Sequence, residues 1–332
     1  MEPTKEKVIY CISPIFPCEL YLYDLKTKIC KCKTLPLAKN VKGKFYEPKT
    51  LPSSIMIGNS CLVSGGGHPD LTEYFKETVI CHFEVGIEWK FKITQVAEML
   101  MGKAEHSLCA ISEDLVLSTG GVNSKGVVGY CEAYSITKNV WAQYMPLTVP
   151  RRQVSSCTFN MEHVYAFCGR NNKGVSVNTI EKLKIGNPKN NWRALILLNE
   201  KSFMPIANPL SIQLNEDTIL IAGGVDYARG STSKVSTGDS FKIQESNKSL
   251  YFNTKTMQFV PGPDLSYATS FPIGSPVEIE GAIGVVDLQM SIYLYSIENK
   301  KWECIREATW NSFRFEIKSA SDMTSNTNSH KY

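Results

Sequence analysis

The chain has 332 residues, of which 43% are hydrophobic and 20% are charged, a composition that supplies a sizeable core and argues against general disorder. Its formal net charge of +4 is small for this length, so we expect no nucleic-acid partner. No run of about 18 apolar residues occurs, which predicts that no helix spans a membrane.

The first residues, "MEPTKEKVIY", lack the basic segment and the apolar stretch of a secretory signal. Most of the eleven cysteines lie within apolar runs such as "SSCTF", and no CxxC spacing occurs. A buried thiol in a reducing compartment behaves as a small hydrophobic group. We therefore expect a cytoplasmic protein with reduced structural thiols, without a metal or another cofactor.

The first predicted elements are three short strands, "KVIYCIS", "ELYLYDLK" and "KICKCKT". Farther along the chain, short β-rich runs alternate with turn residues, and the one stretch that suggests helical periodicity, 93–106, is interrupted by Gly102. Many short strands at regular spacing are typical of a β-sandwich, a β-barrel or a β-propeller.

An internal repeat distinguishes between these folds. Strands end in glycine at Gly65, Gly120, Gly169 and Gly223, so a unit recurs about every 50 residues. Hairpin turns precede the last three of these strands, in "ISEDL", "FNMEH" and "LNEDT". A further strand comes before each turn and two strands follow the glycines, which gives a unit of four antiparallel strands. The last strand of the unit carries an aromatic residue, as at Trp89, Trp141 and Trp192.

This pattern resembles the kelch-repeat β-propeller family. The clearest copy is 145–192, which contains "VPRRQVSSCTFNMEHVYAFCGR" and then "TIEKLKIGNPKNNW". The resemblance covers residues 5–317 and implies an all-β, six-bladed β-propeller of four-stranded antiparallel blades. The blades expected are 5–38, 52–98, 104–147, 151–198, 204–264 and 267–306.

The first of these blades lacks its opening strand. We expect "TWNSFRFEI", at 309–317, to supply that strand and so to close the ring by pairing with the N-terminal blade. Closure has a physical reason, because an open ring leaves unpaired strand edges. The remaining tail, 318–332, is small and polar, so we expect it to be disordered.

The glycine pairs could also belong to a phosphate-binding loop. The segment "AGGVDYARGSTS" has neither of the glycine spacings that cradle phosphate, and no helical pattern follows it. We therefore interpret the glycines as points where neighbouring backbones approach closely. The tryptophans, one on an outer strand of most units, are interpreted as fillers between blades.

The five histidines are dispersed, and His68, in the loop after a triple glycine, is the best candidate for a polar site. Copper oxidases of the kelch fold need tyrosine and histidine ligands that cannot be assigned here. Six-bladed kelch mutarotases are periplasmic, whereas we find no export signal. We expect no enzymatic activity; the alternative is a mutarotase- or oxidase-like or small-molecule-binding propeller with its site at the channel mouth.

In the kelch family, the loops after the glycines and the loops between blades share the face that usually carries partner contacts. In adaptor-type members, arginines at positions such as those of Arg152 and Arg170 bind acidic peptides. The insertion at 226–247 is the longest departure from the repeat, and we expect it on the same face. The resemblance implies a partner-binding surface formed by His68, Asp70, Asn123, Lys125, Arg151, Arg152, Arg170, Asn171, Asp226, Tyr227, Arg229 and Tyr267.

We accordingly expect a monomeric scaffold or adaptor that binds a protein or peptide partner. Cytoskeletal, signalling and ubiquitin-ligase partners are the classes that the resemblance implies. The ligase class is weakened because few residues precede the first strand, which leaves no room for a BTB or F-box module. Repeats predict the fold, and they do not name the partner.

Overall fold

The computed structural model describes residues 8–12, 19–34, 51–68, 72–84, 90–197, 199, 206–227, 243–269, 276–279, 281–287 and 291–306. These residues form β-strands and turns. No described segment is a helix long and apolar enough to cross a lipid bilayer. The predicted closing strand at 309–317, the tail at 318–332 and residues 228–242 of the insertion lie outside the described residues.

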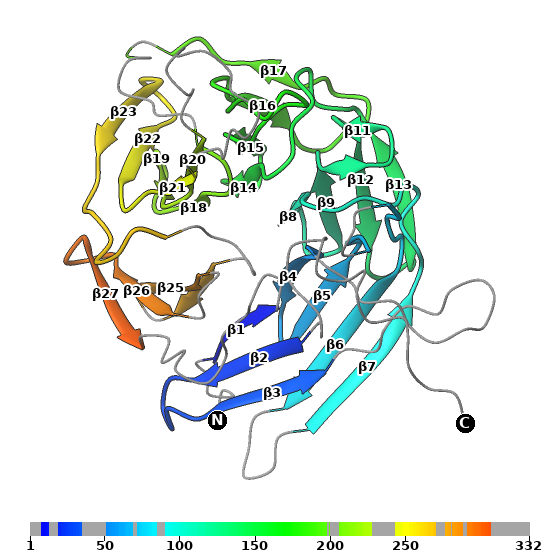
Figure 1. Cartoon of the computed structure of the whole chain (residues 1–332), viewed down its shortest axis with the longest axis horizontal. Helices are drawn as coiled ribbons and strands as arrows, with labels where there is room; N and C mark the ends of the chain where they lie inside the picture. Colours follow the sequence, from blue (N-terminus) through cyan, green and yellow to red (C-terminus); the bar gives the residue numbers. More distant parts are fainter. Residues whose placement is uncertain are drawn as a thin grey trace, which may run out of the picture.

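Five four-stranded antiparallel sheets are the blades of a β-propeller. Figure 1 shows them arranged in a ring, with β4, β8, β14 and β18 nearest its centre. The first three blades comprise β4 (Ser53–Ile57), β5 (Ser60–Ser64), β6 (Thr78–Glu84) and β7 (Lys90–Val96); β8 (Ser107–Ala110), β9 (Leu115–Thr119), β12 (Cys131–Ser135) and β13 (Val140–Tyr144); and β14 (Ser155–Phe159), β15 (His163–Phe167), β16 (Glu181–Lys184) and β17 (Arg193–Ala194).

The other two blades comprise β18 (Leu210–Gln213), β19 (Thr218–Ala222), β22 (Ser249–Asn253) and β23 (Gln258–Pro261); and β24 (Val277–Ile279), β25 (Ala282–Val286), β26 (Ile292–Ser296) and β27 (Lys301–Arg306). Two small hairpins follow the glycines of two blades. They are β10 (Val122–Asn123) with β11 (Gly126–Val127), and β20 (Val225–Tyr227) with β21 (Ile243–Glu245).

A sixth sheet has three strands, β1 (Val8–Ile12), β2 (Glu19–Asp24) and β3 (Cys30–Thr34). Its buried Ile9 and Leu22 belong to one core cluster with Val63 of β5 and Val286 of β25. The sheet therefore packs against the first and the last of the four-stranded blades. Six four-stranded blades were predicted, and the described residues form five together with this three-stranded sheet.

Aromatic residues on or just before the outer strand join two of the blades to the preceding blade. The indole N–H of Trp141 donates a hydrogen bond of 3.0 Å to the carbonyl of Ala97, and that of Trp192 donates one of 3.0 Å to the carbonyl of Met145. Ala97 and Met145 each follow the outer strand of the preceding blade. Both tryptophans are buried, so they fill the space between blades as the sequence predicts.

The glycines mark the closest approach between blades. Gly120 has a φ of +63°, and a Cβ atom placed on it would lie 2.5 Å from the carbonyl oxygen of Arg151 in the next blade. The N–H of Gly121 donates a 2.9 Å hydrogen bond to that same oxygen. Equivalent bonds join Gly66 to Lys103 and Gly169 to Ile206, at 2.9 Å in both cases. This close approach confirms the structural interpretation of the glycines.

Candidate functional site

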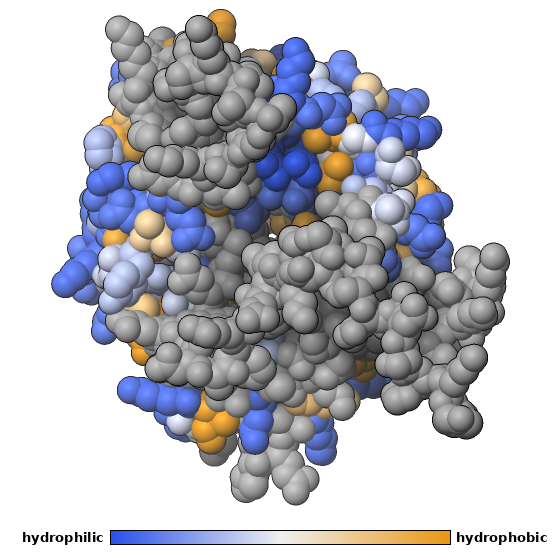
Figure 2. All heavy atoms as spheres, viewed as in Figure 1, coloured by the Kyte–Doolittle hydropathy of each residue, from blue (hydrophilic) through white to orange (hydrophobic). Residues whose placement is uncertain are grey.

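The loops after the glycines and the loops between blades meet at one end of the ring, here called the glycine end. Backbone bridges join the two kinds of loop in three blades, pairing Ala104 with Val122, Arg152 with Arg170, and Ala207 with Val225. The opposite end, where the two innermost strands of each blade are joined, is called the hairpin end. On the face seen in Figure 2, hydrophilic side chains gather beside the recessed centre of the ring.

A chain of backbone hydrogen bonds runs across the glycine end from blade to blade. The N–H of Glu105 donates to the carbonyl of Leu51 at 3.2 Å, that of Gln153 to Glu105 at 2.9 Å, and that of Asn208 to Gln153 at 2.8 Å. All four residues have φ between +52° and +59°. This left-handed backbone costs a non-glycine residue about 1 kcal/mol or more. The hydrogen bonds between blades hold this backbone conformation, and they fix the positions from which the side chains at the glycine end extend.

Glu105 organises the side chains at this position. Its Oε2 lies 3.3 Å from Nη1 of Arg152, and its Oε1 accepts a 3.1 Å hydrogen bond from Nε2 of Gln153. The Arg152 side chain is 23% exposed, whereas that of Glu105 is 7% exposed. Partial burial and the charge of Glu105 raise the pKa of Tyr74, and the charge of Arg152 opposes this. The result is a half-buried polar cluster of an acid, an amide, a phenol and a guanidinium group.

Arg170 begins beside Arg152. The N–H of each residue donates to the carbonyl of the other, at 3.0 and 2.9 Å. Residues that face each other in an antiparallel bridge project their side chains to the same side of the backbone, with Cα atoms about 5.5 Å apart. Two arginine stems therefore leave one side of the same backbone pair, and both side chains are partly exposed. With Glu105 counted, this patch carries a net positive charge.

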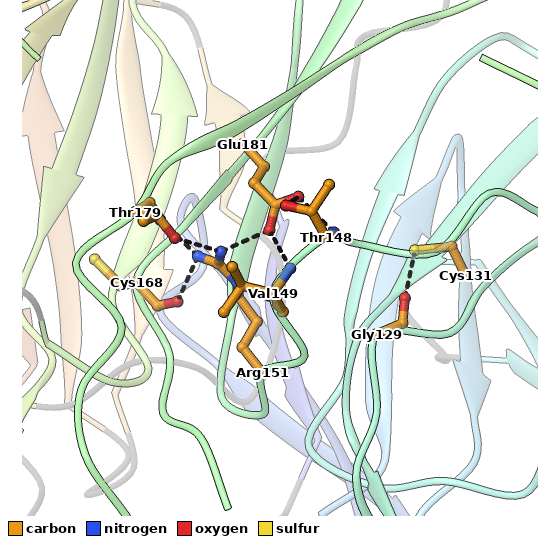
Figure 3. A network of polar contacts seen from close by, with 8 residues as sticks. All are labelled: Gly129, Cys131, Thr148, Val149, Arg151, Cys168, Thr179 and Glu181. Atoms are coloured by element: carbon orange, nitrogen blue, oxygen red, sulfur yellow. Dashed lines mark hydrogen bonds and ion pairs between the residues drawn. The ribbon is translucent and has the colours of Figure 1, made fainter. Parts of the chain in front are cut away.

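Arg151 is not a surface residue, which corrects its predicted place among the partner contacts. Its side chain is fully buried, with Nη2 at 2.7 Å from Oε1 of Glu181. Nη1 donates to the carbonyls of Thr179 and Cys168, at 2.6 and 3.2 Å (Figure 3). The Glu181 carboxylate also accepts the backbone N–H of Thr148 at 2.7 Å. The pair of Arg151 and Glu181 thus holds the loop that precedes this blade against the blade itself.

The preceding blade repeats this buried pair with different residues. Nζ of Lys103 lies 3.9 Å from Oε1 of Glu132, and both side chains are fully buried. Glu132 accepts the backbone N–H of Leu100 at 2.7 Å, as Glu181 accepts that of Thr148. Burial lowers the pKa of Lys103 and raises that of Glu132, while each charge opposes the shift of the other. The pairs are therefore a structural feature of the repeat.

Asn123 is also directed inward. It is 9% exposed, and its Oδ1 accepts the N–H of Lys125 at 2.9 Å, which shapes the turn between β10 and β11. Lys125 itself is exposed. The neighbouring loop meets this turn, because Oδ1 of Asn172 accepts the N–H of Val127 at 2.7 Å. Asn171 is partly exposed and uses its Oδ1 for the N–H of Lys173 in its own loop.

The other predicted contacts are more scattered. His68 is partly buried, and its N–H donates to the carbonyl of Glu73 at 2.9 Å. Tyr267 is 51% exposed. Asp226 and Tyr227 lie on β20, while Asp70 and Arg229 fall outside the described residues. The structure brings Arg152 and Arg170 together, and places Lys125 in a loop that touches the one holding Asn171.

Tyr74 and Gln153 belong to the polar cluster around Glu105, although the sequence analysis did not predict them. Tyr74 is nine positions beyond Gly65 in a loop without repeat counterparts, so no periodic signal marks it. Gln153 follows the two arginines that were predicted as partner contacts. Its position two residues before an inner strand is the signal that could have identified it. Among the described residues, no group of three His, Cys, Asp or Glu side chains could hold a metal ion.

No protein-family model matches the chain, and no curated protein matches it. Among solved structures, the one titled "Structure of YjhT" is similar, with a TM-score of 0.62. The likeness covers 92% of this chain and 99% of that one, at 14% sequence identity. At this identity the likeness shows the fold alone, and the chain shares the β-propeller fold of YjhT.

Proposed function

We propose that this protein is a non-catalytic, kelch-type interaction scaffold that binds a protein partner at the glycine end of its ring. The observation that carries the proposal is the backbone pairing of Arg152 with Arg170, from which two partly exposed arginine side chains leave the same side. Guanidinium groups pair with carboxylates through two parallel hydrogen bonds. The partner class is therefore a protein segment that carries acidic residues.

The surroundings of the arginines suit a peptide. Exposed loops on both sides, with Lys125 and Asn172, offer further hydrogen-bond donors around the pair. Polar loops at the rim and a few anchoring groups at the centre are the usual anatomy of a protein interface. Glu105 neutralises part of the charge of Arg152, so the patch carries only a small net positive charge. This remaining charge favours an acidic partner.

Affinity purification of the tagged chain, followed by mass spectrometry, tests this proposal. We expect the Arg152→Ala, Arg170→Ala double variant to lose the main partner, with binding at least about tenfold weaker, since charged interfacial pairs contribute 2 kcal/mol or more. Arg193→Ala is the matched control, because Arg193 is an exposed arginine on the outer strand β17. Unchanged recovery by the double variant would refute the proposal. Binding of small carboxylates with no protein recovered would favour the small-molecule alternative.

We further propose that the three-stranded sheet is a sixth blade and that 309–317 supplies its inner strand. In support, among the described strands β1 pairs with β2 alone, whereas the second strand of each four-stranded blade pairs with a strand on both sides. An unpaired inner edge leaves backbone groups without partners. We expect a chain ending at Arg306 to melt roughly 5–10 °C lower than one ending at Ile317. Equal melting temperatures of these two chains would exclude this closure.

A further inference from the structure

A cavity of about 430 Å³ lies at the hairpin end of the channel, opposite the proposed partner surface. Residues near the ends of β4, β8, β14 and β18 line it, together with the β24–β25 hairpin. Small-molecule sites in proteins have volumes of roughly 300–1,000 Å³. The cavity is therefore large enough for a small ligand, and the partner-binding role of the glycine end does not use it.

Aliphatic side chains form part of the walls of this cavity, and polar side chains contribute a similar share of its exposed surface; the aliphatic ones are Ile55, Met56, Leu108, Ile212, Leu214 and Ile283. Several polar groups among them are already engaged by the protein. The Thr158 hydroxyl donates to the carbonyl of Ala110, and the Gln213 carbonyl accepts the N–H of Asn160 at 2.8 Å. The Ser211 hydroxyl is bonded to that of Ser155 at 2.7 Å. An entering molecule would thus meet aliphatic side chains beside polar groups, several of which already have partners within the protein.

Of the described residues that line the cavity, the charged one is Glu278 on β24. Its side chain is exposed, and no ion pair to it occurs within the described part of the chain. The neighbouring inner hairpins add the exposed carboxylates of Glu113 and Glu216. Lysines at this end, such as Lys138 and Lys300, lie instead in turns that join outer strands. Within the described ranges, the charges nearest the cavity are therefore negative.

We propose that this cavity binds a small organic cation, with its ammonium group at Glu278 and its apolar body against the aliphatic walls. Burial of the apolar body supplies most of the affinity, because apolar surface removed from water is the main driving force. The exposed carboxylate adds a smaller term, since ion pairs in water contribute about 0.2–1 kcal/mol. That term corresponds to a preference of up to about fivefold for the cation over a neutral molecule of the same shape.

Ligand-detected NMR titrations of the full chain with hexylammonium, 1-hexanol and hexanoate test this proposal. We expect hexylammonium to bind about three- to fivefold more tightly than hexanol, and hexanoate to bind most weakly. Glu278→Gln should reduce hexylammonium to the level of hexanol and leave hexanol unchanged. Glu113→Gln is the control, because Glu113 is an exposed carboxylate at the same end that does not line the cavity. Ala110→Trp, which fills the cavity, should abolish binding of all three.

Equal affinities for the three probes, or an unchanged preference in Glu278→Gln, would overturn the assignment of a cation site. Absence of binding by every probe would overturn the assignment of the cavity as a ligand site. Thermal melting of each variant establishes that the fold is retained. The partner surface at the glycine end is measured separately, so either result leaves that proposal standing.

Discussion

Arg151→Met should destabilise the protein by about 3–5 kcal/mol, because it leaves the Glu181 carboxylate buried without its charge partner. Arg151 and Glu181 are both fully buried, 2.7 Å apart. Methionine fills a similar volume, so the loss comes from the charge and its hydrogen bonds more than from packing. Urea unfolding followed by tryptophan fluorescence measures the change.

Two further variants make this test specific. Arg151→Met combined with Glu181→Leu removes both charges, and we expect it to recover a large part of the lost stability. Arg152→Met is the matched control, because the neighbouring Arg152 is partly exposed and its ion pair contributes about 1 kcal/mol or less. A loss for Arg151→Met no larger than that for Arg152→Met would contradict this account of the buried pair.

Gly120→Ala should cost about 2–4 kcal/mol. An alanine at φ +63° is strained by about 1–2 kcal/mol, and its Cβ would meet the Arg151 carbonyl oxygen at 2.5 Å. Gly174→Ala isolates the strain from φ alone, because Gly174 has a similar φ of +71° and nothing within 4 Å of its added Cβ. We expect Gly174→Ala to cost about 1–2 kcal/mol. Equal losses in thermal or urea unfolding would mean that close contact between blades is not what requires glycine at position 120.

Sequence periodicity was sufficient to predict the architecture of the described blades. Glycines equivalent to Gly120 and tryptophans equivalent to Trp192 recur at fixed spacing, and each of these two residues contacts the neighbouring blade. Their spacing in the sequence therefore predicts how the blades pack. Strand order follows, since short hairpin turns such as "NMEH" join only antiparallel neighbours. The completeness of the ring was harder to predict from the sequence. The described residues of the N-terminal sheet form three strands, and no local pattern in them specifies a fourth.

Individual site residues were harder to predict for a different reason. Arg151 and Arg152 are adjacent in "PRRQ", and one is fully buried while the other is partly exposed. Successive residues in an extended segment point to opposite sides, so a shift of one position in the alignment exchanges their roles. Asn123 presents a similar difficulty, because an asparagine that shapes its own turn looks the same in a sequence as one that binds a partner.

Hydrogen–deuterium exchange of the purified chain, with and without its recovered partner, tests the central claim most directly. We predict slower exchange on binding in 122–128 and 170–177, the loops around the arginine pair at the glycine end. The turns at 111–115 and 160–163 at the hairpin end should be unchanged, which makes them an internal control. Protection at the hairpin turns with none at the glycine-end loops would contradict the account.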